Sequence, residues 1–252
     1  MKTAIVTGAA RGIGLAITNR FLSEGYNVGM LDIDEQTLAA AAGRISSESV
    51  LALTCDVSDP DAVVASVASI HQRFGSVDAL VNNAGIATFC SFAETRNDDW
   101  SAILATNLSG AFYCSQACLP YLLAGGGSIV NITSISGLRA STLRTAYGTS
   151  KAALAHLTTQ MAAELGNQGV RVNAVAPGPV DTEMAKKVHS AEIRADYHQA
   201  IPLNRYGTEQ EIANVVVFLC GPESSYVNGQ EIAVDGGFGA TGIGLGTLRT
   251  GS

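Results

Sequence analysis

Short runs of Val, Ile and Leu alternate along this chain with longer segments whose apolar residues recur at helical spacing. That alternation is typical of repeated strand–helix–strand units. The apolar runs predict strands at Thr3–Thr7, Asn27–Asp32, Val50–Thr54, Ala79–Asn82, Ser128–Ile132, Arg171–Ala176 and Glu231–Val234. The periodic segments predict helices at about Gly12–Glu24, Glu35–Ile45, Asp59–Phe74, Asp98–Leu123, Thr145–Gly166 and Glu209–Cys220. We therefore expect an α/β fold, a single-domain Rossmann-like doubly wound parallel sheet of about seven strands with helices on both faces.

Two segments have no clean period. Residues 183–202 are charged and follow a predicted strand end, where open α/β sheets bind ligands, so we expect a substrate lid there. The glycine-rich segment 238–252 is expected to form a C-terminal tail, either a frayed end or an arm that contacts a neighbouring subunit. The remaining residues, 1–237, are expected to form one domain.

Composition narrows the class of partner. The 252 residues carry a net charge of −7 without a run of Lys or Arg, which argues against nucleic acid and favours a small molecule. Glycines interrupt the apolar N-terminus too early for a signal or membrane segment, so we expect a cytoplasmic protein and no membrane contact. Five cysteines without CxxC spacing and four scattered histidines predict no metal site.

A glycine-rich turn, TGAARGIG, follows the first predicted strand. Glycine permits a tight turn and lets the backbone approach a pyrophosphate at the positive end of the next helix. Such a turn can also be purely structural. If it binds a dinucleotide, the contacting residues are Gly8, Arg11, Gly12, Ile13 and Gly14.

Asp32 ends the second predicted strand about 20 residues after this turn, where a carboxylate can accept hydrogen bonds from the adenosine ribose hydroxyls. Together with Asp34 it would repel a 2′-phosphate. Arg11 instead favours NADP, because a basic residue in the turn could pair with that phosphate. We expect NAD, with NADP as the less favoured alternative.

Polar residues and a glycine also follow the third and fourth predicted strands. Asp56 and Val57 end the third, and Asn83, Ala84 and Gly85 follow the fourth. Each could be ordinary turn chemistry, but together they predict a cofactor crevice across the sheet.

Ser134, Tyr147 and Lys151 form the candidate reaction centre. Tyr147 and Lys151 are four residues apart and share one helical face. An ammonium near a phenol is expected to lower the tyrosine pKa toward working pH, as a general base requires. Ser134 could hydrogen-bond the substrate oxygen. A lone YxxxK pair can also be a chance helical spacing.

This chain resembles the short-chain dehydrogenase/reductase family over nearly its whole length. The resemblance rests on residues that occur in the family's order and approximate spacing: Thr7 to Gly14, Asp56, Asn82 to Gly85, Asn107, Ser134, Tyr147, Lys151, Asn173, Pro177, Gly178, Thr182 and Val234 to Gly237. Thr133 stands where many relatives have a second serine.

The resemblance implies further roles. It implies a catalytic tetrad of Asn107, Ser134, Tyr147 and Lys151, with Lys151 also holding the nicotinamide ribose and Asn107 positioning a water in the proton relay. Nicotinamide contacts are implied for Pro177, Gly178, Val180 and Thr182. A homotetramer assembled through helices matching residues 107–122 and 145–166 is also implied.

The substrate side is less determined. Ser134, Ser136, Leu138, Tyr147 and Met184 could line a mixed apolar pocket. Basic residues at Arg139, Arg144, Lys186, Lys187 and Arg194 could pair with an anionic substrate group such as a carboxylate, sulfonate or phosphate, or they could be solvated loop charges.

We therefore expect an oxidoreductase, an NAD-dependent short-chain alcohol dehydrogenase or ketone reductase that transfers a hydride between NAD(H) and a small secondary alcohol or ketone. The alternative within the family is an NADP-dependent 3-oxoacyl-[acyl-carrier-protein] reductase. The alternative of another class is a non-catalytic dinucleotide-sensing protein, which loss of Tyr147 or Lys151 would signal.

Overall fold

Seven parallel strands form one sheet, in the order β3-β2-β1-β4-β5-β6-β7, in the computed structural model, which describes residues 1–241. The strands are β1 (Thr3–Thr7), β2 (Asn27–Asp32), β3 (Val50–Thr54), β4 (Ala79–Asn82), β5 (Ser128–Ile132), β6 (Arg171–Pro177) and β7 (Glu231–Val234). Every residue of β1 and β5 is buried, as expected for parallel strands covered on both faces. The strand order reverses between β1 and β4, which opens a crevice at their carboxyl ends. The predicted fold class is confirmed.

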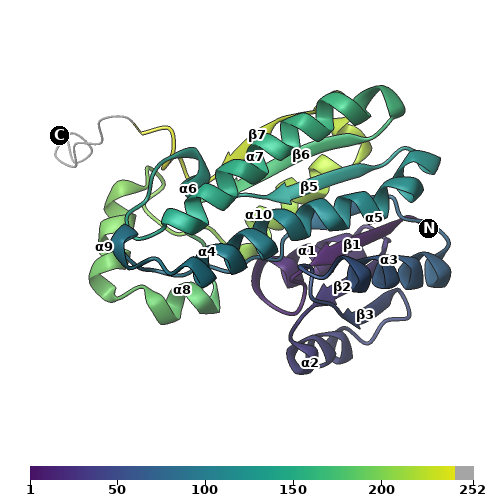
Figure 1. Ribbon diagram of the computed structural model, residues 1–252, viewed down its shortest axis with the longest axis horizontal. Helices are drawn as coiled ribbons and strands as arrows, with labels where there is room; N and C mark the ends of the chain where they lie inside the picture. The colour runs from purple at the N-terminus through teal and green to yellow at the C-terminus, as the bar shows by residue number, and fades with distance from the viewer. Residues whose placement is uncertain (242–252) are drawn as a thin grey trace.

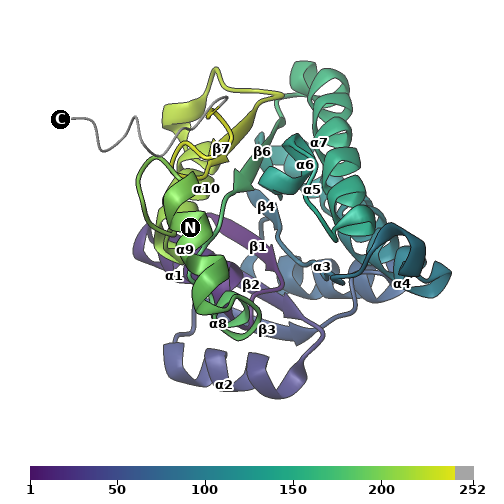
Figure 2. The ribbon, with the colours of Figure 1, turned by 90° about the vertical axis from the view of Figure 1, so that its left-hand side faces the viewer.

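Helices cover both faces of the sheet (Figure 2). One layer contains α1 (Gly12–Ser23), α2 (Glu35–Ile45) and α10 (Glu209–Cys220), and the other contains α3 (Pro60–Phe74), α5 (Gly110–Gly125) and α7 (Thr145–Leu165). Phe21 of α1 and Val216 of α10 pack in the first core, and Ile70 of α3 and Leu122 of α5 pack in the second. All four side chains are fully buried, so each layer is fixed to the sheet by apolar packing.

The prediction of a single helix at Asp98–Leu123 is wrong in one respect. The chain forms α4 (Asn97–Leu104), then a π-helical turn (Ala105–Ser109), then α5. A π turn accommodates an additional residue and changes which side chains face inward. Asn107 lies in this turn and is 1% exposed.

The predicted lid segment is not irregular. It forms two short helices, α8 (Glu183–Val188) and α9 (Ala191–Ala200), which begin at the side-chain caps Thr182 and Ser190. Both lie beyond the carboxyl ends of the strands (Figure 1). The hydroxyl of Tyr206 lies 2.9 Å from Nδ1 of His189, and this contact ties the end of α8 to the body.

The shorter elements are α6 (Ile135–Leu138) and 3₁₀ turns at Phe92–Glu94, Gly166–Gln168 and Pro222–Ser224. Within residues 1–241, no helix has the length and apolar character needed to cross a bilayer. Most of the predicted C-terminal tail, residues 242–252, lies outside the described part of the chain.

Candidate active site

The glycine turn between β1 and α1 has no side chains that would keep a ligand away from its backbone at the glycine positions. A Cβ added to Gly14 would lie 2.1 Å from the carbonyl oxygen of Gly8, so only glycine fits at residue 14. The N-cap of α1, Arg11, makes no side-chain capping bond, and the first turn, which includes Gly12 and Ile13, holds no acidic residue. The first N–H groups of α1 therefore have no side-chain acceptor. An uncapped helix start fits a pyrophosphate.

Asn83 braces this turn. Its Nδ2 donates to the carbonyl oxygens of Thr7 (2.9 Å) and Gly8 (3.1 Å). The Oγ1 of Thr7 in turn accepts from the backbone N–H groups of Asn83 and Ala84, each at 3.0 Å. The sequence predicted Asn83 and Ala84 as cofactor contacts, and the structure shows that both also lock the loop after β4 to the turn after β1.

Asp32 lies at the end of β2 beside the turn. Its carboxylate accepts from the backbone N–H of Ala10 at 2.9 Å and from that of Asp34 at 3.0 Å. The guanidinium of Arg11 pairs with the carboxylate of Asp34. Hydrogen bonds from Thr37 are the main reason that the pKa of Asp34 is lowered, with Arg11 adding to them. Arg11 therefore already has an anionic partner.

Asp56 and Val57 lie beyond the end of β3 rather than at it, because that strand stops at Thr54. The exposed carboxylate of Asp56 accepts from the backbone N–H and the hydroxyl of Ser58, at 2.9 and 2.7 Å. Val57 is buried and fills the space above Gly110, where an added Cβ would lie 2.8 Å from its Cγ2. This turn thus joins the cofactor side of the sheet to the start of α5.

Ser134, Tyr147 and Lys151 come together at the carboxyl end of β5. Ser134 is the N-cap of α6, and Tyr147 and Lys151 lie on consecutive turns at the start of α7. Ser134 lies close enough to Tyr147 to lower the pKa of its phenol. The Nζ of Lys151 lies 5.8 Å from the ring centre of Tyr147 and donates to the carbonyl oxygen of Ile132 at 2.7 Å.

The electrostatics of this group differ from the sequence prediction. Burial lowers the pKa of Lys151 to about 8. Burial also raises the pKa of Tyr147, opposed by Ser134 and by the charge of Arg144. The prediction that Lys151 lowers the tyrosine pKa below its usual value is therefore wrong for these side chains, because desolvation outweighs the opposing effects.

Asn107 is anchored next to them. Its Oδ1 accepts from the backbone N–H of Ile86 at 2.8 Å, and its Nδ2 donates to the carbonyl of Ile86 and to Oγ of Ser150, both at 3.0 Å. A Cβ on Gly85 would lie 3.3 Å from Oδ1 of Asn107 and 3.4 Å from Nζ of Lys151. Gly85 thus lets the backbone run close to both polar side chains. The sequence did not identify Ser150, although it lies between Tyr147 and Lys151.

The residues predicted near the nicotinamide follow β6. Pro177 ends the strand, and the backbone N–H of Gly178 donates to the carbonyl of Val234 at 3.0 Å. Val180 forms an isolated bridge with Gly207, and Thr182 caps α8. Their backbone therefore leads from the sheet directly into α8.

Two of the predicted pocket residues lie on α6. Ser136 is buried, with its N–H donating to Oγ of Ser134 at 3.1 Å, whereas Leu138 is 45% exposed. The side chains of Met184 and Lys187 lie outside the described part of the structure. Among the residues that the structure does describe, no three His, Cys, Asp or Glu side chains gather as a metal ion would require.

The basic residues around the site differ in their partners. Arg139 donates to the carbonyl of Thr241 at 3.1 Å, Lys186 pairs with Glu183 at 2.9 Å, and Arg194 pairs with Asp181 at 2.8 Å. Arg144 instead lies over the ring of Phe89, with its Cζ 4.3 Å from the ring centre.

A Rossmann-like sheet with a glycine turn and this polar cluster at its carboxyl end defines the class of dinucleotide-dependent oxidoreductases. A family model described as enoyl-(acyl carrier protein) reductase matches residues 8–239. With the relatives described next, this match shows that the chain belongs to the short-chain dehydrogenase/reductase family.

Two relatives illustrate its range. The chain is 39% identical to a 3-oxoacyl-[acyl-carrier-protein] reductase of Chlamydia muridarum, over 94% of this chain and 96% of the relative. It is 38% identical to the 2-(R)-hydroxypropyl-CoM dehydrogenase of Xanthobacter autotrophicus, over 95% of this chain and 99% of the relative.

Solved structures agree in fold. A short-chain dehydrogenase/reductase (glucose/ribitol dehydrogenase) from Brucella melitensis matches with a TM-score of 0.90 and 36% identity, over 94% of this chain and 96% of that one. A gluconate 5-dehydrogenase from Burkholderia cenocepacia, in complex with NADP and tartrate, matches with a TM-score of 0.90 and 32% identity, over 96% of each chain.

Proposed function

We propose that this oxidoreductase, which acts on CH–OH groups, transfers a hydride between NAD(H) and small secondary alcohols or ketones. The observation that carries the proposal is the grouping of Ser134, Tyr147 and Lys151 at the same carboxyl edge of the sheet as the uncapped glycine turn. Among the relatives, the Xanthobacter enzyme is named for a 2-hydroxypropyl substrate, which is a secondary alcohol.

Each side chain has a proposed part in the reaction. The nicotinamide, when bound, accepts or gives the hydride. In the oxidising direction Tyr147 takes the hydroxyl proton, and in the reducing direction it returns it. Ser134 donates a hydrogen bond to the substrate oxygen, which fixes that oxygen near the phenol. Lys151 holds the nicotinamide ribose, and Asn107 positions a water that carries the proton onward.

The raised pKa of Tyr147 sets an expected pH dependence. A phenol with a raised pKa is deprotonated only at alkaline pH, so the oxidation rate should climb as pH rises toward the tyrosine pKa. Ketone reduction needs the protonated phenol and should not show this climb. Initial rates in both directions across pH would reveal the opposite trends.

The preference for NAD is supported by Asp32 and by the pairing of Arg11 with Asp34. Asp32 faces the glycine turn through Ala10, and Arg11 would have to leave a carboxylate to bind a 2′-phosphate. The Burkholderia relative was solved with NADP, which makes NADP the competing cofactor. Steady-state kcat/KM for NAD and NADP decides between them, and a preference for NADP would contradict the proposal.

A 3-oxoacyl-[acyl-carrier-protein] reductase is the second candidate function, favoured by the similarity to the Chlamydia relative. It predicts reduction of a 3-oxoacyl thioester with NADPH and little oxidation of simple alcohols. A screen of polyols, hydroxy acids and cyclic alcohols with NAD, followed at the NADH absorbance, separates it from the first candidate.

We further propose a cytoplasmic homotetramer assembled through α5 and α7. The side chain of Phe112 on α5 is 43% exposed and that of Leu123 is 37% exposed, and both are apolar surface that a second subunit could bury. Light scattering coupled to gel filtration tests the assembly, and a monomer would refute it.

Tyr147→Phe is the central test of the catalytic assignment. Removing the proton-transferring hydroxyl should reduce kcat by about 10²- to 10⁴-fold and leave NAD binding largely intact. Lys151→Ala should impair both, since Lys151 is assigned to the ribose as well. Near-normal turnover by Tyr147→Phe would refute the catalytic assignment, whereas dinucleotide binding without any turnover by the wild-type protein would favour a dinucleotide-sensing role.

A further inference from the structure

Arg144 lies beside the proposed catalytic tyrosine. It is the N-cap residue of α7, three positions before Tyr147. Its Cζ is 4.3 Å from the ring centre of Phe89 and 5.7 Å from that of Tyr147. A guanidinium stacked on an aromatic face keeps its N–H groups pointing outward in its own plane, where they can bind a planar anion.

Arg144 also differs from the other basic residues near the site. Arg194 and Lys186 are paired with carboxylates, and Arg139 donates to a backbone carbonyl. Within residues 1–241, no carboxylate forms an ion pair with Arg144 and no hydrogen bond from its guanidinium is found. Arg144 is half-buried, so its charge is only partly solvated.

The position of Arg144 is unfavourable for folding. It is the N-cap residue of a 21-residue helix, and it supplies no side-chain cap. A cation at this end opposes the helix dipole, and an Asn, Asp, Ser or Thr would be the stabilising choice. Local choices that oppose stability are expected at functional sites.

The charge of Arg144 extends over the space between α7 and the lid. It lowers the pKa of Tyr147 and, after burial, is the next cause that lowers the pKa of His189 at the end of α8. Arg144 is therefore close enough to both side chains to act on a molecule lying between them.

We propose that Arg144 binds an anionic group of the substrate, so that the preferred substrates are small hydroxy acids or oxo acids rather than neutral alcohols. This inference rests on the proposed oxidoreductase function. The guanidinium forms paired hydrogen bonds to the anion while the hydroxyl carbon lies at Tyr147 and Ser134. Because Arg144 and Tyr147 are neighbours, only a short spacer can separate the anion from the reacting carbon.

Kinetics with a matched pair of substrates test this directly. The pair is 3-hydroxybutyrate and its methyl ester, which differ in charge but not in the reacting alcohol. The variants are Arg144→Gln, Arg144→Lys as a partial replacement of the charge, and Arg139→Gln as a matched control on the same loop. Dinucleotide binding, measured by NADH fluorescence, serves as the control for folding.

We expect Arg144→Gln to lower kcat/KM for the acid by about 10- to 100-fold, mainly through KM, and to leave the ester nearly unchanged. Arg144→Lys should recover part of the loss, and Arg139→Gln should change neither substrate. Equal losses on the acid and the ester would overturn the proposal, since Arg144 would then act on Tyr147 and not on the anion. An unchanged KM for the acid would overturn it as well.

A binding measurement separates this proposal from the proposed function. Acetoacetate and its methyl ester are titrated calorimetrically into the NADH-bound Tyr147→Phe variant, with and without Arg144→Gln. Weaker binding of acetoacetate alone on loss of Arg144 supports the anion site even if the wild-type protein oxidises no alcohol, which would refute only the proposed reaction. Equal binding of acetoacetate by the Tyr147→Phe variant with and without Arg144→Gln overturns the proposed anion site.

Discussion

Two cations lie at opposite ends of the same sheet and have different consequences. Lys151, near the carboxyl end of β5, is 3% exposed and donates to one carbonyl, that of Ile132. Arg171, at the amino end of β6, donates to the carbonyls of Leu219 (2.8 Å), Gly221 (3.1 Å) and Val227 (3.4 Å). The arginine joins β6 to the segment between α10 and β7.

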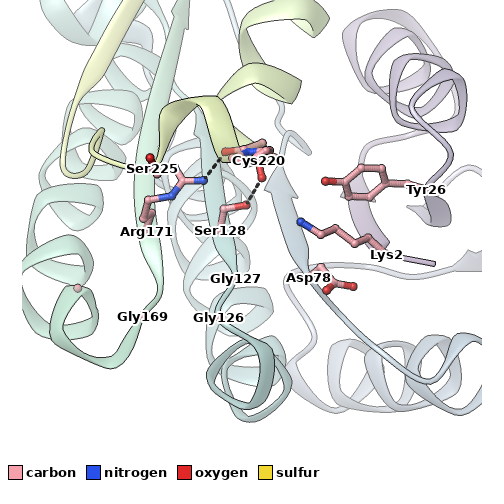
Figure 3. Close-up of a pocket in the computed structure, with 13 residues that line it drawn as sticks. Lys2, Tyr26, Asp78, Gly126, Gly127, Ser128, Gly169, Arg171, Cys220 and Ser225 are labelled. Atoms are coloured by element: carbon pink, nitrogen blue, oxygen red, sulfur yellow. Dashed lines mark hydrogen bonds between the residues drawn. The ribbon is translucent and has the colours of Figure 1, made fainter.

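Arg171 also borders open space. Arg171 lines a cavity of about 350 Å³ together with Lys2, Tyr26 and Asp78 (Figure 3). Three of its N–H groups donate to carbonyls, so this permanently charged side chain serves as a structural connection. Lys151 retains uncommitted N–H groups and a pKa of about 8, so it is available to a ligand. The number of hydrogen-bond acceptors around each cation thus separates a structural role for Arg171 from a ligand-binding role for Lys151.

Activity should separate the two sites most strongly. Lys151→Met should reduce kcat/KM by about 10²- to 10⁴-fold, because the proposed contact with the nicotinamide ribose next to Tyr147 is lost. Arg171→Met should leave kcat of the folded enzyme unchanged, since no proposed site residue contacts it. Assays at saturating cofactor, normalised to folded protein by circular dichroism, measure both. A comparable loss in Arg171→Met would end the distinction.

The free energy of unfolding should depend on Arg171 in the way that activity depends on Lys151. Arg171→Met removes three hydrogen bonds that a charged donor makes, although Ser224 and Asn173 still donate to the same carbonyls, so we expect the free energy of unfolding to fall by about 2 to 4 kcal/mol. Urea unfolding at pH 7 measures the change, with Arg139→Gln as the exposed control that should change it little. An unaltered midpoint would show that the three hydrogen bonds add no net stability.

The smallest expected effect is a gain in stability. Burial of Lys151 disfavours its charged form, so Lys151→Met should raise the free energy of unfolding at pH 7 by roughly 1 to 3 kcal/mol. The folded pKa of about 8 is below the ordinary 10.5, so the unfolded chain binds more protons between these values. Wild-type stability should therefore rise across that window, and the advantage of the variant should shrink. A pH-independent difference would contradict the buried-charge explanation.

The sheet was predictable because its strands are short apolar runs that parallel packing buries completely. Six of the seven predicted strands have the observed bounds, and β6 continues one residue further than predicted, to Pro177. The π turn was not predictable from periodicity, since Ala105–Ser109 reads as ordinary helix and its geometry depends on the packing around Asn107. The lid helices were missed because they are short, although their caps at Thr182 and Ser190 were visible signals.

The grouping of the candidate site was predictable from spacing and resemblance, but its electrostatics were not. Spacing places Tyr147 and Lys151 on one face, whereas the pKa of each depends on desolvation that only the folded chain defines. The same limit applies to Arg139 and Arg144. They are equivalent in the sequence, and only their surroundings distinguish a carbonyl-bound arginine from one that lies over an aromatic ring.

The π turn at Asn107 has an evolutionary consequence. Converting Ala105–Ser109 to regular α-helix without removing a residue would rotate every later residue of α5 by about 100° relative to α4 and shift it by about 1.5 Å. No intermediate geometry exists between the two states. A lineage with this helix can exchange side chains one by one, yet it can neither gain nor lose the turn gradually, so the turn is expected to be inherited as a unit.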